Sequence, residues 1–231
     1  MALVHGAKEP LGVSSGLVLY LDAANARSYP RTGPTWFDRS GNGNNGTLEG
    51  GVGYSGSNFG SLTFDGTNDY INGVHDATLN LTGDVTVELW FRLTATVFNQ
   101  DYIRIFGKGN NDNRTWSLWY HVGNQQFLYQ RYGSTNMNAV YSATVSLNTW
   151  YHMVGTSSSN NHVLYLNGVS RATSSTGTTF ASSTDPYTIG QGITNQYHIG
   201  NIAKAAVYNR ALTATEIAQN YNALKGRYGL S

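Results

Sequence analysis

Residues 197–228 read YHIGNIAKAAVYNRALTATEIAQNYNALKGRY and decide the fold, because an apolar strand is followed here by the only convincing helix of the chain. Thr213 and Glu216 have the spacing of a capping box, which predicts that the helix begins directly after Thr213. Leu212 and Ile217 flank that start with the spacing of a hydrophobic staple. Two local signals therefore agree on where the helix starts.

One side of this predicted helix is apolar. Ile217, Tyr221 and Leu224 fall at i, i+4 and i+7, and Gly226 predicts the end of the helix. A single short amphipathic helix cannot bury such a side by itself. It needs a large, mostly non-helical body to pack against.

The composition predicts that this body consists of strands. The chain has 231 residues, of which 40% are hydrophobic, which suffices for a sizeable core. Only 12% are charged, and the 27 glycines stand with Asn, Ser and Thr between the apolar runs. Such usage is typical of many short strands that are joined by turns.

Charge and cysteine content exclude several classes. The formal net charge is +1 without a basic run, which argues against a nucleic-acid partner or an anionic membrane surface. The absence of cysteine excludes a disulfide scaffold and a thiolate metal site. No stretch approaches membrane-spanning length, and residues 1–10 lack the pattern of a signal peptide, so we expect no secretion by that route.

Alternating residues mark the strands. Val85–Leu93 is the clearest strand, with five apolar residues on one face and Thr86, Glu88, Trp90 and Arg92 on the other. Further strand-like segments occupy residues 16–21, 61–65, 103–106, 116–122, 127–132, 150–156 and 163–166, and the Asn167-Gly168 pair predicts a hairpin. We therefore expect two packed antiparallel sheets in one domain over residues 16–231, preceded by an arm or linker over residues 1–15.

Several short motifs carry a family resemblance. FDG at 64–66, WYH at 150–152, LYLNG at 164–168 and YNRAL at 208–212 follow one another as the landmarks of laminin G-like, concanavalin A-like jelly rolls do. The likeness covers residues 16–228. It implies an all-β fold, a two-sheet antiparallel jelly-roll sandwich with one short C-terminal helix.

A narrower resemblance involves both ends of the domain. LYLDAAN at 19–25, DRSGNG at 38–43 and NYNALKGRY at 220–228 are similar to versions of this domain in structural proteins of tailed bacteriophages. This likeness implies a virion protein that is made in the host cytoplasm and exposed on the particle, with a capsid or fibre protein as its partner.

Aromatic residues suggest a glycan surface. Sugar rings stack on aromatic side chains, while amides and arginines bind their hydroxyls. On residues 116–121 Trp119 and His121 share one face, and Tyr129 and Arg131 share a face of the next strand. These four are the candidate glycan contacts, although the sequence leaves open which face of each strand is core.

Catalysis is not expected. A glycoside hydrolase on this fold would need two facing carboxylates, and no strand carries acids at alternate positions, since Glu88 is flanked by Thr86 and Trp90. GNGNNG at 41–46 matches a dinucleotide-binding pattern by letter, but no helical period follows it. We read it as a glycine-rich turn.

A metal site has weak support. Asp65 and Asp69 could supply oxygen ligands to a structural calcium ion, as the resemblance implies, but a plain Asx turn is the favoured interpretation. Residues 201–204 read NIAK where relatives often place an acid, which removes one ligand. The histidines lack zinc-ligand spacing, and His152 is interpreted as a core residue.

Three function classes remain open from the sequence. The favoured one is a non-catalytic virion accessory or decoration protein, attached to a capsid or fibre through residues 1–15 or a sheet edge, that exposes its surface to cell-surface polysaccharide. A symmetric homo-oligomer would suit this role. The alternatives are a free carbohydrate-binding lectin module and, less favoured, a glycoside hydrolase.

Overall fold

The computed structural model describes residues 12–95, 102–110, 113–121, 123–133, 136–176, 179–192 and 196–231. Residues 1–11, most of the predicted arm, lie outside this set. No helix in the described ranges is long and apolar enough to cross a membrane.

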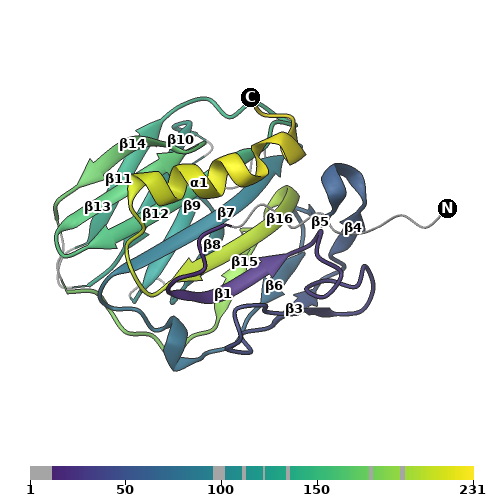
Figure 1. The fold of residues 1–231 in the computed structure, drawn as a ribbon, viewed down its shortest axis with the longest axis horizontal. Helices are drawn as coiled ribbons and strands as arrows, with labels where there is room; N and C mark the ends of the chain where they lie inside the picture. Colours follow the sequence, from purple (N-terminus) through teal and green to yellow (C-terminus); the bar gives the residue numbers. More distant parts are fainter. Residues whose placement is uncertain are drawn as a thin grey trace.

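Two antiparallel sheets of eight strands each form the body of the protein (Figure 1). The first sheet has the order β14-β13-β12-β7-β16-β5-β4, and β1 also pairs with β16. Its strands are β1 (Leu17–Asp22), β4 (Gly53–Ser55), β5 (Ser61–Asp65), β7 (Val85–Leu93), β12 (Tyr151–Ser158), β13 (Asn161–Leu166), β14 (Val169–Ser174) and β16 (Ile199–Tyr208). The second sheet has the order β11-β10-β9-β8-β15-β6-β3-β2. Its strands are β2 (Thr35–Trp36), β3 (Gly46–Glu49), β6 (Tyr70–Asn72), β8 (Tyr102–Lys108), β9 (Trp116–His121), β10 (Gln126–Arg131), β11 (Met137–Ser142) and β15 (Tyr187–Ile189).

The main core lies between the two sheets. Strand β7 contributes the apolar face that its alternation predicted, including Val87, Leu89 and Phe91, and all three are buried. Gly155 of β12 shows how closely the layers approach, because a Cβ there would lie 2.3 Å from the ring of Tyr129 on β10. The predicted all-β sandwich is therefore confirmed.

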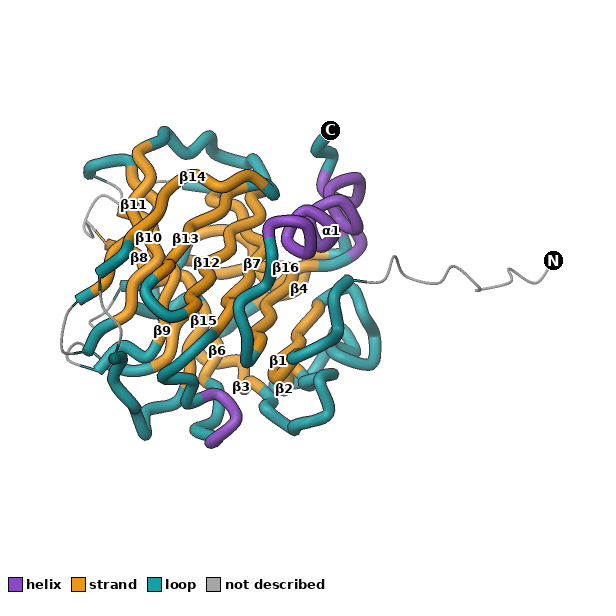
Figure 2. The backbone as a smooth tube through the Cα atoms, turned by 60° about the vertical axis from the view of Figure 1, so that its left-hand side comes forward, coloured by secondary structure: helices purple, strands orange, loops and turns teal. Residues whose placement is uncertain are grey.

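Helix α1 (Ala214–Leu224) covers the outer face of the first sheet, where it lies across β12, β7 and β16 (Figures 1 and 2). The capping box is present, since the Thr213 hydroxyl accepts from the Glu216 N–H and the Glu216 carboxylate accepts from the Thr213 N–H. Leu212 and Ile217 pack in one apolar cluster, as the staple predicted.

The end of the helix differs from the prediction. Gly226 does not stop the chain's helical path, because a 3-10 turn over Lys225–Tyr228 continues from α1. The left-handed residue that ends it is Gly229, with φ of 70°. This turn keeps Tyr228 buried against Trp90, with ring centroids 4.4 Å apart.

Removing the helix cap gives a first testable prediction. We expect Thr213→Ala to lower the free energy of unfolding by about 1 kcal/mol, because the Glu216 N–H loses its acceptor. Urea denaturation measures the change, and the exposed Thr32→Ala is the matched control. Equal midpoints for the two variants would show that the cap contributes nothing.

The described end of the predicted arm, residues 12–15, belongs to the folded body. The Val13 N–H donates to Asn220 Oδ1 at 2.8 Å, and the Tyr208 hydroxyl donates to the Val13 carbonyl at 3.1 Å. Arg210 Nε donates to the Ser15 carbonyl at 2.9 Å. These bonds join the segment to α1 and to the end of β16.

Candidate functional site

The four predicted glycan contacts separate onto two faces of the second sheet. Trp119 and His121 lie on its outer face, which is the side away from the first sheet, and their exposed fractions are 3% and 6%. Tyr129 and Arg131 point into the core, and both have an exposed fraction of 0%. A sugar cannot contact Tyr129 or Arg131 in this fold. Of the four predicted glycan contacts, Trp119 and His121 on the outer face remain.

Strand register explains this separation. Tyr129 pairs with Leu118, which is a core residue, and side chains alternate between the faces of a strand. The Tyr129 hydroxyl shares a hydrogen bond of 2.8 Å with Ser157 on the opposite sheet. Arg131 donates to the carbonyl oxygens of Thr115, Gly83 and Leu81, so its guanidinium ties loops to the core. Both residues are structural.

The outer face carries an aromatic and guanidinium cluster centred on Trp119. The Tyr102 ring on β8 meets the Trp119 ring edge-on at 6.4 Å and the His121 ring at 3.9 Å between centroids. The guanidinium carbons of Arg104 and Arg114 lie 5.9 and 4.7 Å from the Trp119 ring centroid. We call this set the outer-face cluster: Tyr102, Arg104, Arg114, Trp119, His121, Gln130 and Tyr132.

Hydrogen bonds fix the deeper members of the outer-face cluster. Trp119 Nε1 donates to Ser117 Oγ at 2.7 Å, and Arg104 donates to the Gly109 carbonyl at 2.6 Å and to Thr188 Oγ1 at 2.8 Å. Burial is the main cause that lowers the pKa of Arg104 to about 10, and the positive charge of Arg114 is the second cause. Arg104 therefore stays a cation at neutral pH, and its hydrogen bonds hold the guanidinium in place.

The upper members of the cluster are the ones that a ligand can reach. The side chain of Tyr102 is 41% exposed, and Arg114 and Tyr132 are half-buried. Arg114 lies over the Tyr132 ring at 4.2 Å and donates to Gln130 Oε1 at 3.1 Å. The surface thus combines an open aromatic ring with guanidinium and amide groups, which suits stacking and hydrogen bonding.

Sequence reasoning missed five members of the cluster: Tyr102, Arg104, Arg114, Gln130 and Tyr132. The alternation of Tyr102 and Arg104 with two isoleucines placed both on one face of β8, but it did not show that this face adjoins Trp119. Arg114 lies before β9 in a segment without periodicity. No sequence signal pointed to it.

Asp65 and Asp69 lie together at a rim of the sandwich and form the favoured Asx turn. Asp65 Oδ1 accepts from the Thr67 N–H at 2.8 Å, and Asp69 Oδ2 accepts from the Asp65 N–H at 3.0 Å. Burial raises the pKa of Asp69. With Gly50 and Gly51 the two acids line an open cavity of about 290 Å³. Nowhere in the described ranges do three His, Cys, Asp or Glu side chains gather to hold a metal.

Glu88 belongs to a buried polar network under α1. Glu88 Oε1 accepts from Lys204 Nζ at 2.8 Å, and Oε2 accepts from Asn220 Nδ2 at 2.7 Å. His152 Nε2 lies 3.3 Å from Oε1, and the His152 ring stacks on Trp90. All of these side chains are buried, as predicted for His152, and a polysaccharide cannot contact Glu88 in this fold.

Comparisons with solved structures find the same fold in binding domains and in an enzyme. The binding domain of Paraclostridial Mosquitocidal Protein 1 is 19% identical with a TM-score of 0.73, covering 93% of this chain and 55% of that chain. Domain 4 of AbnA, a GH43 extracellular arabinanase from Geobacillus stearothermophilus in complex with arabinotriose, is 16% identical with a TM-score of 0.71, covering 90% and 98%. Trypanosoma rangeli sialidase in complex with the inhibitor DANA is 18% identical with a TM-score of 0.66, covering 94% and 34%.

These likenesses establish the fold. The chain spans about half the length of the mosquitocidal-protein domain and nearly all of the arabinanase domain. No curated protein matches the sequence. The sequence does match the Concanavalin A-like lectin/glucanases superfamily over residues 65–218, which is more than half of its 231 residues. The chain therefore belongs to the Concanavalin A-like lectin/glucanases superfamily.

Proposed function

We propose that the protein is a non-catalytic carbohydrate-binding module and that the outer-face cluster is its glycan contact surface. The observation that carries the proposal is the exposed Tyr102 ring, which packs edge-on against the buried Trp119, while the half-buried Arg114 lies over both Trp119 and Tyr132. A rigid base lowers the entropy lost on binding, because the contact groups are already ordered.

The chemistry of the cluster favours binding over hydrolysis. Most glycoside hydrolases use a pair of carboxyl groups that flank the scissile bond. The members of the outer-face cluster are aromatic, guanidinium, imidazole and amide groups, so they offer stacking and hydrogen bonds. The arabinanase domain of the same fold was solved in complex with arabinotriose, which supports an oligosaccharide as the ligand class.

A glycan array with matched variants tests this proposal. We expect the wild-type protein to bind a subset of oligosaccharides, and we expect Tyr102→Ala to bind them at least about tenfold more weakly, because the stacking ring is lost. Phe59→Ala removes an exposed aromatic ring outside the cluster and should bind as the wild type does. An array without any signal, or equal losses in both variants, would contradict the proposal.

We further propose a virion as the setting of this module. Support comes from the likeness of residues 19–25, 38–43 and 220–228 to structural proteins of tailed bacteriophages. In that setting a capsid or fibre protein anchors the domain, and the outer-face cluster stays open to host polysaccharide. We expect the purified protein to cosediment with phage particles. Failure to find the protein in phage particles by proteomics would contradict the virion setting.

A further inference from the structure

A second cavity lies between α1, β1 and residues 12–17. It is on the first sheet, whereas the outer-face cluster is on the second sheet. Its volume is about 230 Å³. Leu17 and Leu224 contribute apolar walls, and Tyr20 contributes its ring. Its lining includes no residue of the outer-face cluster and neither Asp65 nor Asp69.

Lys204, which is buried, is one of the residues that line the cavity. Lys204 Nζ carries three hydrogens, one of which it donates to Glu88 Oε1. The Tyr20 ring centroid lies 5.3 Å from the nitrogen on another side. Among the described residues Glu88 is the one hydrogen-bond acceptor of this ammonium. The group can therefore donate to an oxygen atom placed in the cavity, which would complete its hydrogen bonding.

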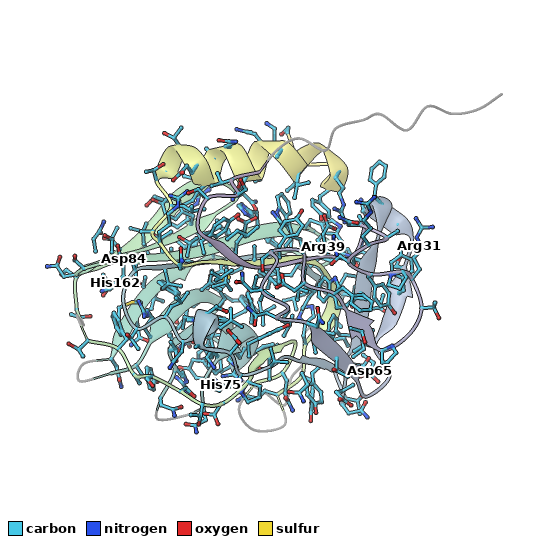
Figure 3. All side chains as sticks on the ribbon, turned by 60° about the horizontal axis from the view of Figure 1, so that its bottom comes forward. Arg31, Arg39, Asp65, His75, Asp84 and His162 are labelled. Atoms are coloured by element: carbon cyan, nitrogen blue, oxygen red, sulfur yellow. The ribbon has the colours of Figure 1, made fainter. Side chains whose placement is uncertain are left out.

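Arg39 adds a second cation to the lining. Its side chain is exposed, and it takes no part in the four ion pairs found among the described residues. Figure 3 shows Arg39 nearer to α1 than Asp65 is. Among the described residues that line the cavity, Lys204 and Arg39 carry charge and none is an acid, and the nearby Glu88 pairs with Lys204.

We propose that this cavity binds a small organic carboxylate with an apolar body. The carboxylate lies between Lys204 and Arg39, where charge-assisted hydrogen bonds are strong, and the body packs on Leu17, Leu224 and Tyr20. A cavity with mostly apolar walls and a few convergent polar groups is the usual form of a small-molecule site. The proposal does not depend on glycan binding.

Calorimetric titration with benzoate, using benzyl alcohol as the neutral analogue, tests the site. We expect benzoate to bind in the millimolar range or tighter, more weakly at high salt, and at least about tenfold more tightly than benzyl alcohol. Arg39→Gln should weaken benzoate binding at least about fivefold by removing one cation. Arg31→Gln, an exposed arginine outside the lining, should leave the affinity unchanged.

Several outcomes would overturn the assignment. Equal affinity for benzoate and benzyl alcohol would show that charge plays no part, and no benzoate binding at millimolar concentration would remove the site. An Arg39→Gln affinity equal to that of the wild type would place any binding elsewhere. Tighter binding of glucuronate than of benzoate would contradict the apolar body. Unchanged benzoate affinity in Tyr102→Ala would confirm that the site is separate from the outer-face cluster.

Discussion

Replacing Lys204 with methionine is expected to lower the free energy of unfolding by roughly 3–5 kcal/mol, because the variant leaves Glu88 as a buried charge without its cation. Burial alone would raise the pKa of Glu88, but the charge of Lys204 and the nearby His152 outweigh burial and hold that pKa below its ordinary value. Burial alone would lower the pKa of Lys204, but the charge of Glu88 outweighs burial and raises that pKa. Each charge therefore depends on the other.

A second substitution tells the lost ion pair apart from lost packing. Glu88→Gln in the Lys204→Met background removes the stranded charge and keeps an oxygen that accepts from Asn220. We expect this double variant to regain at least half of the lost stability, since replacing both partners of a buried pair costs far less than removing one. Urea denaturation at pH 7 measures both variants. A loss that Glu88→Gln does not reduce would mean that the ion pair is not what Lys204 provides.

Acidification is expected to destabilise the fold through buried histidines. His198 is fully buried, with its ring edge-on to Phe64 and Phe91 at 5.7 and 6.2 Å, and burial lowers the pKa of His198 to about 4 from 6.5. The unfolded chain therefore binds a proton that the folded protein does not bind between pH 6.5 and 4. Each unit of pKa corresponds to about 1.4 kcal/mol, so stability falls by roughly 3 kcal/mol as the pH drops through this window. Burial also lowers the pKa of His152, which adds a loss of the same sign.

The pH profile of a His198→Leu variant checks this account. The variant cannot take up the proton, so its free energy of unfolding should fall less steeply than that of the wild type between pH 6.5 and 4. Val163→Ala, which removes buried apolar atoms but no titrating group, should lower stability at every pH and keep the wild-type slope. Parallel profiles for His198→Leu and wild type would contradict the assignment.

The architecture could be predicted from the sequence because local patterns carried it. Strand β7 alternates so regularly that its apolar face could be read from the sequence, and the Thr213–Glu216 capping box located the start of α1 to the residue. Asn167 and Gly168 both have positive φ, 53° and 73°, in the tight hairpin that the pair predicted. Each of these signals lies within about ten residues.

The candidate site depends on contacts that no local pattern encodes. Strands β9 and β10 carry large side chains on both faces, so alternation alone could not decide whether Trp119 or Trp116 was core. Only the register, which pairs Tyr129 with Leu118, places Tyr129 inside. The Glu88 network likewise joins residues 116 and 132 positions apart in the sequence.

The five tryptophan indoles provide the most direct test of glycan binding at the outer face. Trp36 and Trp116 lie in the core and Trp90 and Trp150 lie under α1, whereas Trp119 alone belongs to the outer-face cluster. We would titrate ¹⁵N-labelled protein with the best-bound array oligosaccharide and follow the five indole cross-peaks. We expect the Trp119 peak to shift with saturation while the other four stay in place. Shifts confined to the Trp90 and Trp150 peaks, or to no indole at saturation, would contradict it.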